Sequence, residues 1–169
     1  MNTIEINAPA ASVREFFLRP KLVLRLHPSC YLKEIKTAEK DVYDITLYDD
    51  KMEEVRRTVL TVEVRGNSIN YIMNSNMTKF LIHEVSPTIT GLSIEDDFFR
   101  KEDLPYWLKG LKNYIQLEVR QSRIVKFLLD RFWLSMTPSQ RRIAIIIIIA
   151  EGTGLAALAA VVLAIKLLK

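Results

Sequence analysis

The segment that most constrains this chain is its C-terminal run from Ile143 to Ile165, 23 residues in which Glu151 is the only charged residue. At a helical rise of about 1.5 Å per residue, a helix of this length spans roughly 35 Å, and the hydrocarbon core of a bilayer is about 30 Å thick. Basic residues precede and follow the run. The pattern predicts one C-terminal transmembrane helix over residues 143–168. A buried core helix is the alternative, but one small domain has little to wrap around a helix that is apolar on every side.

The remainder of the chain is predicted to lie on the cytoplasmic side of a cell membrane, in a single-pass topology. Residues 1–12 lack the basic and apolar regions of a secretory signal. Residues 101–142 carry nine Lys or Arg and four Asp or Glu, a net charge of +5, whereas residues 1–100 have a net charge of −2. Basic residues mark the cytoplasmic flank of a span, and they favour anionic headgroups. No nucleic-acid recognition motif accompanies them, so nucleic acid is not an expected partner.

The first hundred residues predict an α+β domain. After a strand at 3–7, residues 12–18 and 22–26 have the apolar spacing of two short helices. From residue 30 the apolar period becomes two, with turn residues at intervals, and no helical period interrupts it. An antiparallel meander is therefore the economical topology. The predicted strands of this run are 30–37, 41–48, 54–65, 67–74, 77–85 and 88–98.

A long amphipathic helix is predicted after the strands, because apolar residues recur at helical spacing from Leu104 to Leu129. Its apolar face is expected to lie on the sheet. Phe132 and Trp133 near its end suit a membrane interface, and Thr137 or Ser139 can cap the helix that follows. The predicted organisation is thus a domain at 1–130, a basic juxtamembrane connector at 131–142 and the span at 143–168.

This order of elements resembles the helix-grip family, also called START-like or SRPBCC, which includes polyketide cyclases and lipid-transfer domains. Residues 4–17, IEINAPAASVREFF, are similar to the family's opening strand and helix. Residues 24–30 fall where members carry a proline before the second strand, residues 88–98 resemble the last strand, and residues 104–119 resemble the closing helix. The resemblance covers about residues 1–130; the membrane-directed tail is not part of the general pattern.

The resemblance implies a curved antiparallel sheet of about seven strands around the long helix, with a cavity for a hydrophobic ligand. Apolar pockets with a few polar groups are also the usual form of small-molecule sites. Plain core packing remains the alternative reading for each inward-facing residue, since both roles need the same residue types. The predicted ligand contacts are Tyr43, Leu47, Val62, Tyr71, Met73, Phe80, Leu92, Trp107, Leu111 and Tyr114.

The sequence contains no recognisable catalytic constellation, metal site or cofactor motif. His27 and His83 are the two histidines; a turn-capping role is favoured for His27, although it could line the mouth of a cavity. His83 and its neighbour Glu84 point to opposite faces of a strand and form no pair. Because Cys30 is the single cysteine, the chain has no disulfide framework and no cysteine-based zinc site. Some family members catalyse cyclisation or dehydration, so enzyme activity stays open without support from these residues.

The predicted span carries two features of its own. Glu151 is an ionisable residue inside an apolar run, a position that is costly and usually functional. Gly152, Ala156, Ala160 and Ala164 recur every four residues and form a small-residue face that lets helices pack closely. Self-association or a membrane partner is one interpretation; a monomeric span with a protonated Glu151 is the other.

The leading functional hypothesis is a membrane-anchored, cytosol-facing domain that binds a hydrophobic ligand (a lipid, isoprenoid or quinone) and transfers it between the membrane and a partner. One alternative is a cyclase or dehydratase that uses the same cavity. Another is a non-enzymatic anchor that recruits a soluble enzyme to the membrane. Helix-grip proteins with membrane-directed tails that belong to carbon monoxide dehydrogenase are of this kind, and residues 27–30 distantly resemble their Pro-Gly-Cys turn. No cofactor is expected under any of these hypotheses.

Overall fold

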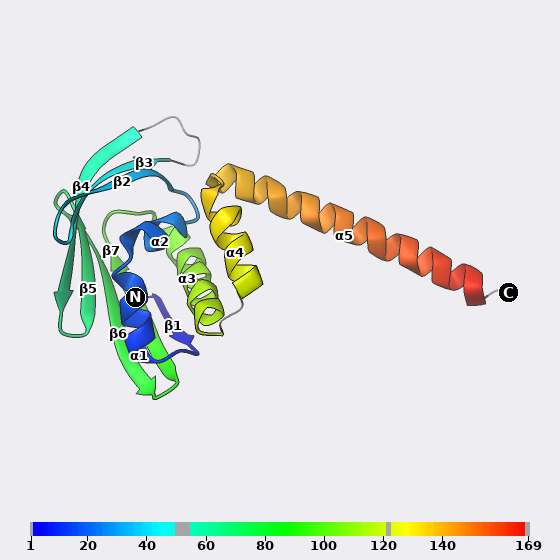
Figure 1. Ribbon diagram of the computed structural model, residues 1–169, viewed down its shortest axis with the longest axis horizontal. Coiled ribbons are helices and arrows are strands. Elements are labelled where there is room, and N and C mark those ends of the chain that lie inside the picture. The colour runs from blue at the N-terminus through cyan, green and yellow to red at the C-terminus, as the bar shows by residue number, and fades with distance from the viewer. Residues whose placement is uncertain (1, 50–54, 121–122, 168–169) are drawn as a thin grey trace.

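A curved sheet and the helices that pack on it form the body of the protein, and a long helix projects from it (Figure 1). The computed structural model describes residues 2–49, 55–120 and 123–167; side chains are described as far as Thr153, apart from those of residues 2, 55, 56 and 123. In chain order the elements are β1 (Asn2–Ile6), α1 (Ala10–Phe17), α2 (Pro20–Arg25), β2 (Tyr31–Glu39), β3 (Val42–Tyr48), β4 (Val55–Arg65), β5 (Ser68–Met73), β6 (Asn76–Ser86), β7 (Ile89–Asp96), η1 (Lys101–Asp103), α3 (Leu104–Val119), α4 (Arg123–Arg131), η2 (Trp133–Ser135) and α5 (Pro138–Leu167).

The seven strands form one antiparallel sheet in the order β1-β7-β6-β5-β4-β3-β2. Strands β2 to β7 are a meander, as the sequence predicts, and β1 pairs with β7. The hairpin turns use residues that tolerate a left-handed backbone: Asp41 (φ 60°), Gly66 (φ 56°) and Asn74 (φ 57°). These short turns keep successive strands adjacent, and the α+β helix-grip architecture is confirmed.

The core lies between the concave face of the sheet and helices α1 and α3. Phe80 on β6 is at its centre, with its ring 4.5 Å from that of Phe17, 5.1 Å from that of Tyr71 and 5.6 Å from that of Trp107. The polar atoms of these aromatic residues are satisfied by backbone. The Tyr71 hydroxyl donates to the Phe17 carbonyl oxygen (2.6 Å), and Trp107 Nε1 donates to the Val23 carbonyl oxygen (3.1 Å). Buried tyrosine and tryptophan thus contribute apolar area without leaving a polar atom unpaired.

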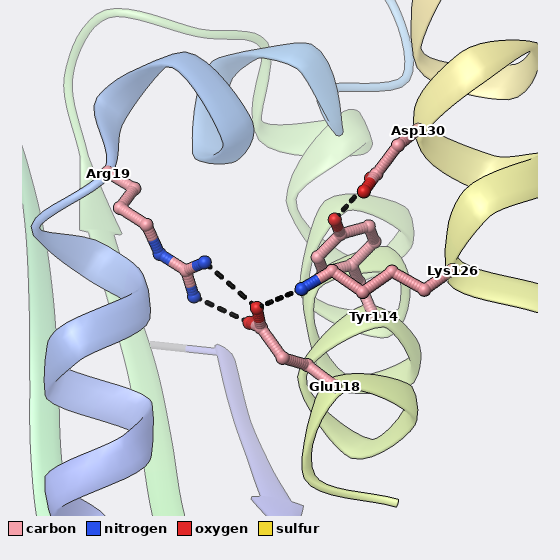
Figure 2. Close-up of polar contacts among 5 residues, drawn as sticks. All are labelled: Arg19, Tyr114, Glu118, Lys126 and Asp130. Atoms are coloured by element: carbon pink, nitrogen blue, oxygen red, sulfur yellow. Dashed lines mark hydrogen bonds and ion pairs between the residues drawn. The ribbon is translucent and has the colours of Figure 1, made fainter. Parts of the chain in front are cut away.

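The expected single long helix is wrong: α3 ends at Val119, and α4 turns back along it. Two contacts join the helices (Figure 2): the Tyr114 hydroxyl donates to Asp130 Oδ1 (2.5 Å), and Lys126 Nζ donates to Glu118 Oε1 (2.6 Å). The reversal lets Leu129 pack against the core, which a straight continuation past the sheet would prevent. The apolar stripe of the sequence is therefore real, but it belongs to two helices.

Glu118 also ties α3 to the first helices. Arg19, between α1 and α2, donates from both terminal nitrogens to the two Glu118 carboxylate oxygens, at 2.9 and 2.5 Å (Figure 2). Hydrogen bonds from Arg19 and Lys126 hold the pKa of Glu118 at about 2, although partial burial acts in the opposite direction. One carboxylate thereby connects three parts of the helical layer.

Part of the segment at 131–142, predicted as a basic juxtamembrane connector, packs on the domain. Leu134 in η2 is buried in the core and Trp133 packs against it. A capping box starts α5: Thr137 Oγ1 accepts from the Gln140 N–H (3.2 Å), and Gln140 Oε1 accepts from the Thr137 N–H (2.9 Å). The capping role that the sequence allowed for Thr137 is thus confirmed.

Helix α5 extends away from the domain (Figure 1). Its first turns carry six isoleucines, at 143 and 145–149, that are 44–66% exposed. Among the residues that the structure describes, no helix has both the length and the hydropathy needed to cross a membrane. Glu151 and Gly152 are exposed; the side chains of Ala156, Ala160 and Ala164, the rest of the predicted small-residue face, lie outside the described residues.

Candidate functional site

The predicted ligand contacts are found mostly in the packed core. Tyr43 is partly buried, and the other nine are at most 6% exposed. Only Leu47 among them lines a hollow that opens at one end of the sheet. Direct ligand contact by the remaining nine stays a prediction. What the structure adds is that several of them, including Tyr71, Phe80 and Trp107, contact one another.

That hollow, here called the mouth hollow, opens where three connections meet at one end of the sheet. They are the link from α2 to β2, the end of β3 and the link from β7 to α3. Its volume is about 200 Å³, enough for one ring-sized group. The residues that line it are His27, Ser29, Cys30, Leu47, Tyr48, Asp49, Phe98, Phe99, Arg100 and Asp103.

His27 is the most constrained side chain of the mouth hollow. Its Nδ1 accepts hydrogen bonds from the backbone N–H groups of Ser29 (3.2 Å) and Cys30 (3.1 Å), so the predicted turn-capping role is confirmed. The ring stacks on Phe99 at 4.2 Å and meets the Trp107 ring edge-on at 4.7 Å. Because Nδ1 accepts, the proton of the neutral ring resides on Nε2. Nε2 is buried and has no hydrogen-bond partner among the described residues.

The surroundings of His27 keep its ring uncharged. Burial lowers the pKa of His27 to about 3, and the positive charge of Arg100 acts in the same direction. The imidazole is therefore neutral throughout the physiological pH range. It offers a fixed N–H donor rather than a group that exchanges protons with a substrate.

Asp103, which also lines the hollow, supplies a hydrogen-bond acceptor. It lies at the end of η1, directly before α3. Its Oδ1 accepts from the Ser29 hydroxyl (2.8 Å), which fixes the carboxylate, while Oδ2 is buried without a partner among the described residues. His27 and Asp103, which both line the hollow, thus carry one buried donor and one buried acceptor without a partner among the described residues, and Phe98 and Phe99 belong to the same lining.

Asp96 stabilises the connection from β7 to α3. Its Oδ2 accepts from the Phe99 N–H (2.7 Å), and its Oδ1 accepts from the Thr78 hydroxyl. These bonds fix the turn that carries Phe99 and Arg100 to the hollow. In the sequence, Asp96 is one of three consecutive acidic residues at 95–97, and this pattern gives no sign of its structural role.

The second histidine lies elsewhere. His83 is exposed on the outer face of β6, and its ring covers Gly91 of β7, where an added Cβ would come within 2.0 Å of His83 Nε2. Reasoning from sequence placed His27 and Leu47 at a cavity but missed Asp103 and Phe99. Their position in the sequence could have indicated this role, because both lie just before α3, near the place where the turn after α2 packs.

Comparison of the whole chain finds relatives at the level of fold. No family model matches the chain, and no curated protein sequence matches it significantly. Solved structures that resemble it include the di-domain aromatase/cyclase StfQ of the steffimycin biosynthetic pathway, with a TM-score of 0.53 and 12% identity over 71% of this chain. The chain spans 45% of the length of that protein.

Two shorter proteins match over nearly their whole length. The Zhui aromatase/cyclase from a Streptomyces species has a TM-score of 0.52 and 11% identity, over 72% of this chain and 94% of its own. A hypothetical protein from Sulfolobus tokodaii has a TM-score of 0.51 and 15% identity, over 75% of this chain and 98% of its own. At such identities these likenesses establish a shared START-like, helix-grip fold, in agreement with the resemblance seen in the sequence.

Proposed function

We propose that this protein binds a hydrophobic small molecule through the mouth hollow and is attached to a membrane by α5. The observation that carries the binding function is the buried, unpartnered Nε2 of His27, in a ring that lines the hollow. A buried donor without a partner costs about 1–3 kcal/mol. A ligand oxygen at this position would offset that cost.

The ligand class follows from the two unused polar atoms and their surroundings. An acceptor such as a carbonyl oxygen suits Nε2–H of His27, and a hydroxyl suits Oδ2 of Asp103. The aromatic rings of Phe98 and Phe99 favour a flat or apolar head group. The hollow holds about 200 Å³, less than most sites for whole drug-sized ligands. We infer that it takes the oxygen-bearing end of a longer apolar molecule, such as a quinone or an isoprenoid.

The membrane attachment rests on α5. Its exposed isoleucines surround the helix rather than forming one stripe, and the apolar sequence continues to Ile165. A helix apolar on all sides is suited to a lipid environment. With the basic residues on its N-terminal side, the domain would face the cytoplasm, where it could transfer its ligand to or from the bilayer.

Catalysis of the cyclase or dehydratase type is the second candidate, because His27 and the carboxylate of Asp103 line the same hollow. The low pKa of His27 argues against it. A general acid or base works best with a pKa near the operating pH, and an imidazole with a pKa of about 3 is too weak a base for that role. Binding is therefore the function that we propose first.

The test is mass spectrometry of apolar compounds extracted from the purified full-length protein. In His27→Asn, the amide oxygen can still accept from the turn, whereas the Nε2–H donor is lost. We expect several-fold less ligand per protein in this variant, and in Asp103→Asn, than in the wild type. His83→Asn is the matched control and should retain the wild-type amount. Wild-type protein without any apolar compound, or folded variants at positions 27 and 103 with full loading, would refute the proposal.

A further inference from the structure

A second hollow lies where α5 leaves the domain, and we call it the junction hollow. It holds about 480 Å³ between the end of α2, the start of α3, η2 and the start of α5. Its lining includes the apolar or aromatic side chains Leu26, Tyr106, Trp133, Pro138 and Ile145, together with Arg141. It is separated from the mouth hollow by Ser29 and Asp103, which line both.

Positive charge is concentrated at this place. Arg141 is only 8% exposed, and its Nε donates to the Trp133 carbonyl oxygen at 2.9 Å. Arg25, at the end of α2, is close enough for its charge to act on Arg141, and its own Nε is buried without a partner among the described residues. Arg142 also lines the hollow. The N-terminus of α5, with its partial positive charge, adds to the same potential.

No carboxylate of the described residues balances Arg141. Burial and the charge of Arg25 lower the pKa of Arg141 to about 10, and the only opposing influence is Tyr31. Among the described residues, neither Arg25 nor Arg141 takes part in a salt bridge. Asp103 also lines the hollow; its Oδ1 accepts from the Ser29 hydroxyl, and among the described residues its Oδ2 has no partner and no salt bridge joins it to Arg141. A buried guanidinium group that has a second guanidinium near it and no salt-bridge partner among the described residues favours an external anion.

The apolar part of the lining identifies what carries that anion. Trp133 and Ile145 are at the side of the hollow from which α5 departs, and the exposed isoleucines follow directly along the helix. We propose that the junction hollow binds the phosphate of an anionic phospholipid, with its acyl chains lying along the first turns of α5. Arg141, which lines the hollow, contacts the phosphate, the nearby charge of Arg25 strengthens the attraction, and Trp133 lies at the level of the headgroup. This inference rests on the proposed membrane attachment and adds lipid selectivity to it.

Trp133 supplies a direct readout, because the chain has two tryptophans and the other, Trp107, is fully buried in the core. The full-length protein is reconstituted into phosphatidylcholine vesicles that contain a minor fraction of phosphatidylglycerol. Brominated acyl chains, which quench tryptophan, are placed either on the phosphatidylglycerol or on an equal fraction of the phosphatidylcholine. Trp133→Phe identifies the signal that comes from Trp133.

We expect brominated phosphatidylglycerol to quench Trp133 more than brominated phosphatidylcholine. Replacing Arg25 and Arg141 by Gln should reduce this preference roughly ten-fold, the effect of losing one charge-assisted hydrogen bond. Arg131→Gln removes an exposed charge of the same sign from α4 and should leave the preference unchanged. Arg25→Gln alone keeps the bond from Arg141 to Trp133 and covers the case in which the double variant does not fold.

Three results would overturn the inference. One is equal quenching by the two lipids while the protein remains in both vesicles, which would leave the membrane attachment intact. Another is an equal loss of preference in the Arg131→Gln control, which would indicate general attraction of charge. The third is binding of inorganic phosphate, seen by phosphorus NMR in pure phosphatidylcholine vesicles, without any preference for phosphatidylglycerol. Failure to enter either vesicle would overturn this site and the membrane attachment together.

Discussion

His27 is kept neutral by burial, and this makes the stability of the protein depend on pH in a defined window. Its pKa is about 3 in the folded protein and about 6.5 when exposed. Between these values the unfolded chain binds a proton that the folded chain does not. The free energy of unfolding should therefore fall as pH decreases from 6.5, by up to about 1.4 kcal/mol per pH unit.

Glu118 titrates in a different window, so the two effects can be separated. Its pKa is lowered from 4.5 to about 2, and its contribution to stability is lost only as pH falls below about 4.5. Chemical unfolding between pH 4.5 and 6.5 thus reports mainly on His27. In this range we expect a shallower pH dependence for His27→Asn than for the wild type and for His83→Asn. Equal slopes in all three proteins would contradict the assignment.

A substitution at Tyr71 can distinguish a role of this residue in core packing from a role in ligand binding. Its hydroxyl donates to the Phe17 carbonyl oxygen inside the core, and Tyr71→Phe leaves that oxygen without its partner. We expect a loss of about 1–3 kcal/mol in the free energy of unfolding, with unchanged ligand content. Tyr106→Phe, at a side chain that is 71% exposed, should change stability by less than about 0.5 kcal/mol. Lower ligand content in folded Tyr71→Phe would show that Tyr71 contacts the ligand.

At the scale of elements, α4 is held on α3 by a small number of polar contacts around Glu118 (Figure 2). In Glu118→Gln the partners Arg19 and Lys126 lose a charged acceptor. Because the Glu118 side chain is 24% exposed, we expect a modest loss of about 1 kcal/mol in the free energy of unfolding. Amide exchange in α4 should accelerate more than amide exchange in the sheet.

A matched control for this change exists on the surface of β2. Glu34 forms an ion pair with Lys36 at 2.9 Å, and both side chains are more than half exposed. Glu34→Gln should have almost no effect on stability. If Glu118→Gln behaved like Glu34→Gln, and α4 exchanged its amides at the wild-type rate, the contacts drawn in Figure 2 would not hold α4 in place.

The strands were predictable from sequence because the two-residue apolar period and the turn residues indicate the same strand boundaries. The run predicted at 67–74 is β5 at Ser68–Met73, and the left-handed Gly66 lies in the turn before it. The helices after the sheet were less predictable, since an apolar stripe of helical period continues through residues 104–129 whether or not the helix reverses. The reversal depends on pairs such as Tyr114 with Asp130, which local pattern cannot reveal.

The candidate site was only partly predictable for a similar reason. The His27-Pro28 turn indicated its place, but the partners of His27 come from a distant part of the chain, residues 99–103. The aromatic residues predicted to line a cavity are of types that occur both in packed cores and in ligand pockets. Their mutual ring contacts are a property of three-dimensional packing that residue type does not determine.

At the scale of the whole molecule, the two hollows and α5 lie at the same end of the domain. The mouth and junction hollows share Ser29 and Asp103, and Arg141 and Ile145 of α5 line the second of them. If α5 enters a bilayer, both hollows would then lie near its surface. An apolar ligand could pass between membrane and mouth hollow over a short distance, with little exposure of its apolar part to water.

In this arrangement the proposed transfer of a ligand depends on the proposed attachment of α5 to a membrane. Ile148 and Ile149 are 66% and 59% exposed, so replacing both by Asp should leave the fold of the domain unchanged. A charged residue within a span costs up to about 3 kcal/mol on insertion scales. We expect the wild type to remain in the membrane pellet after alkaline carbonate extraction, and a large part of the Ile148→Asp, Ile149→Asp variant to move to the supernatant.

Val85→Asp is the control for this experiment, because Val85 is 51% exposed on the far end of β6 and has no part in α5. It should stay in the pellet with the wild type. Wild-type protein that remained folded and monodisperse in the supernatant without detergent would contradict the attachment. The exposed isoleucines would then have to be buried by something other than lipid, and direct exchange of a ligand with a bilayer would no longer be expected. Binding in the mouth hollow could still be tested with His27→Asn.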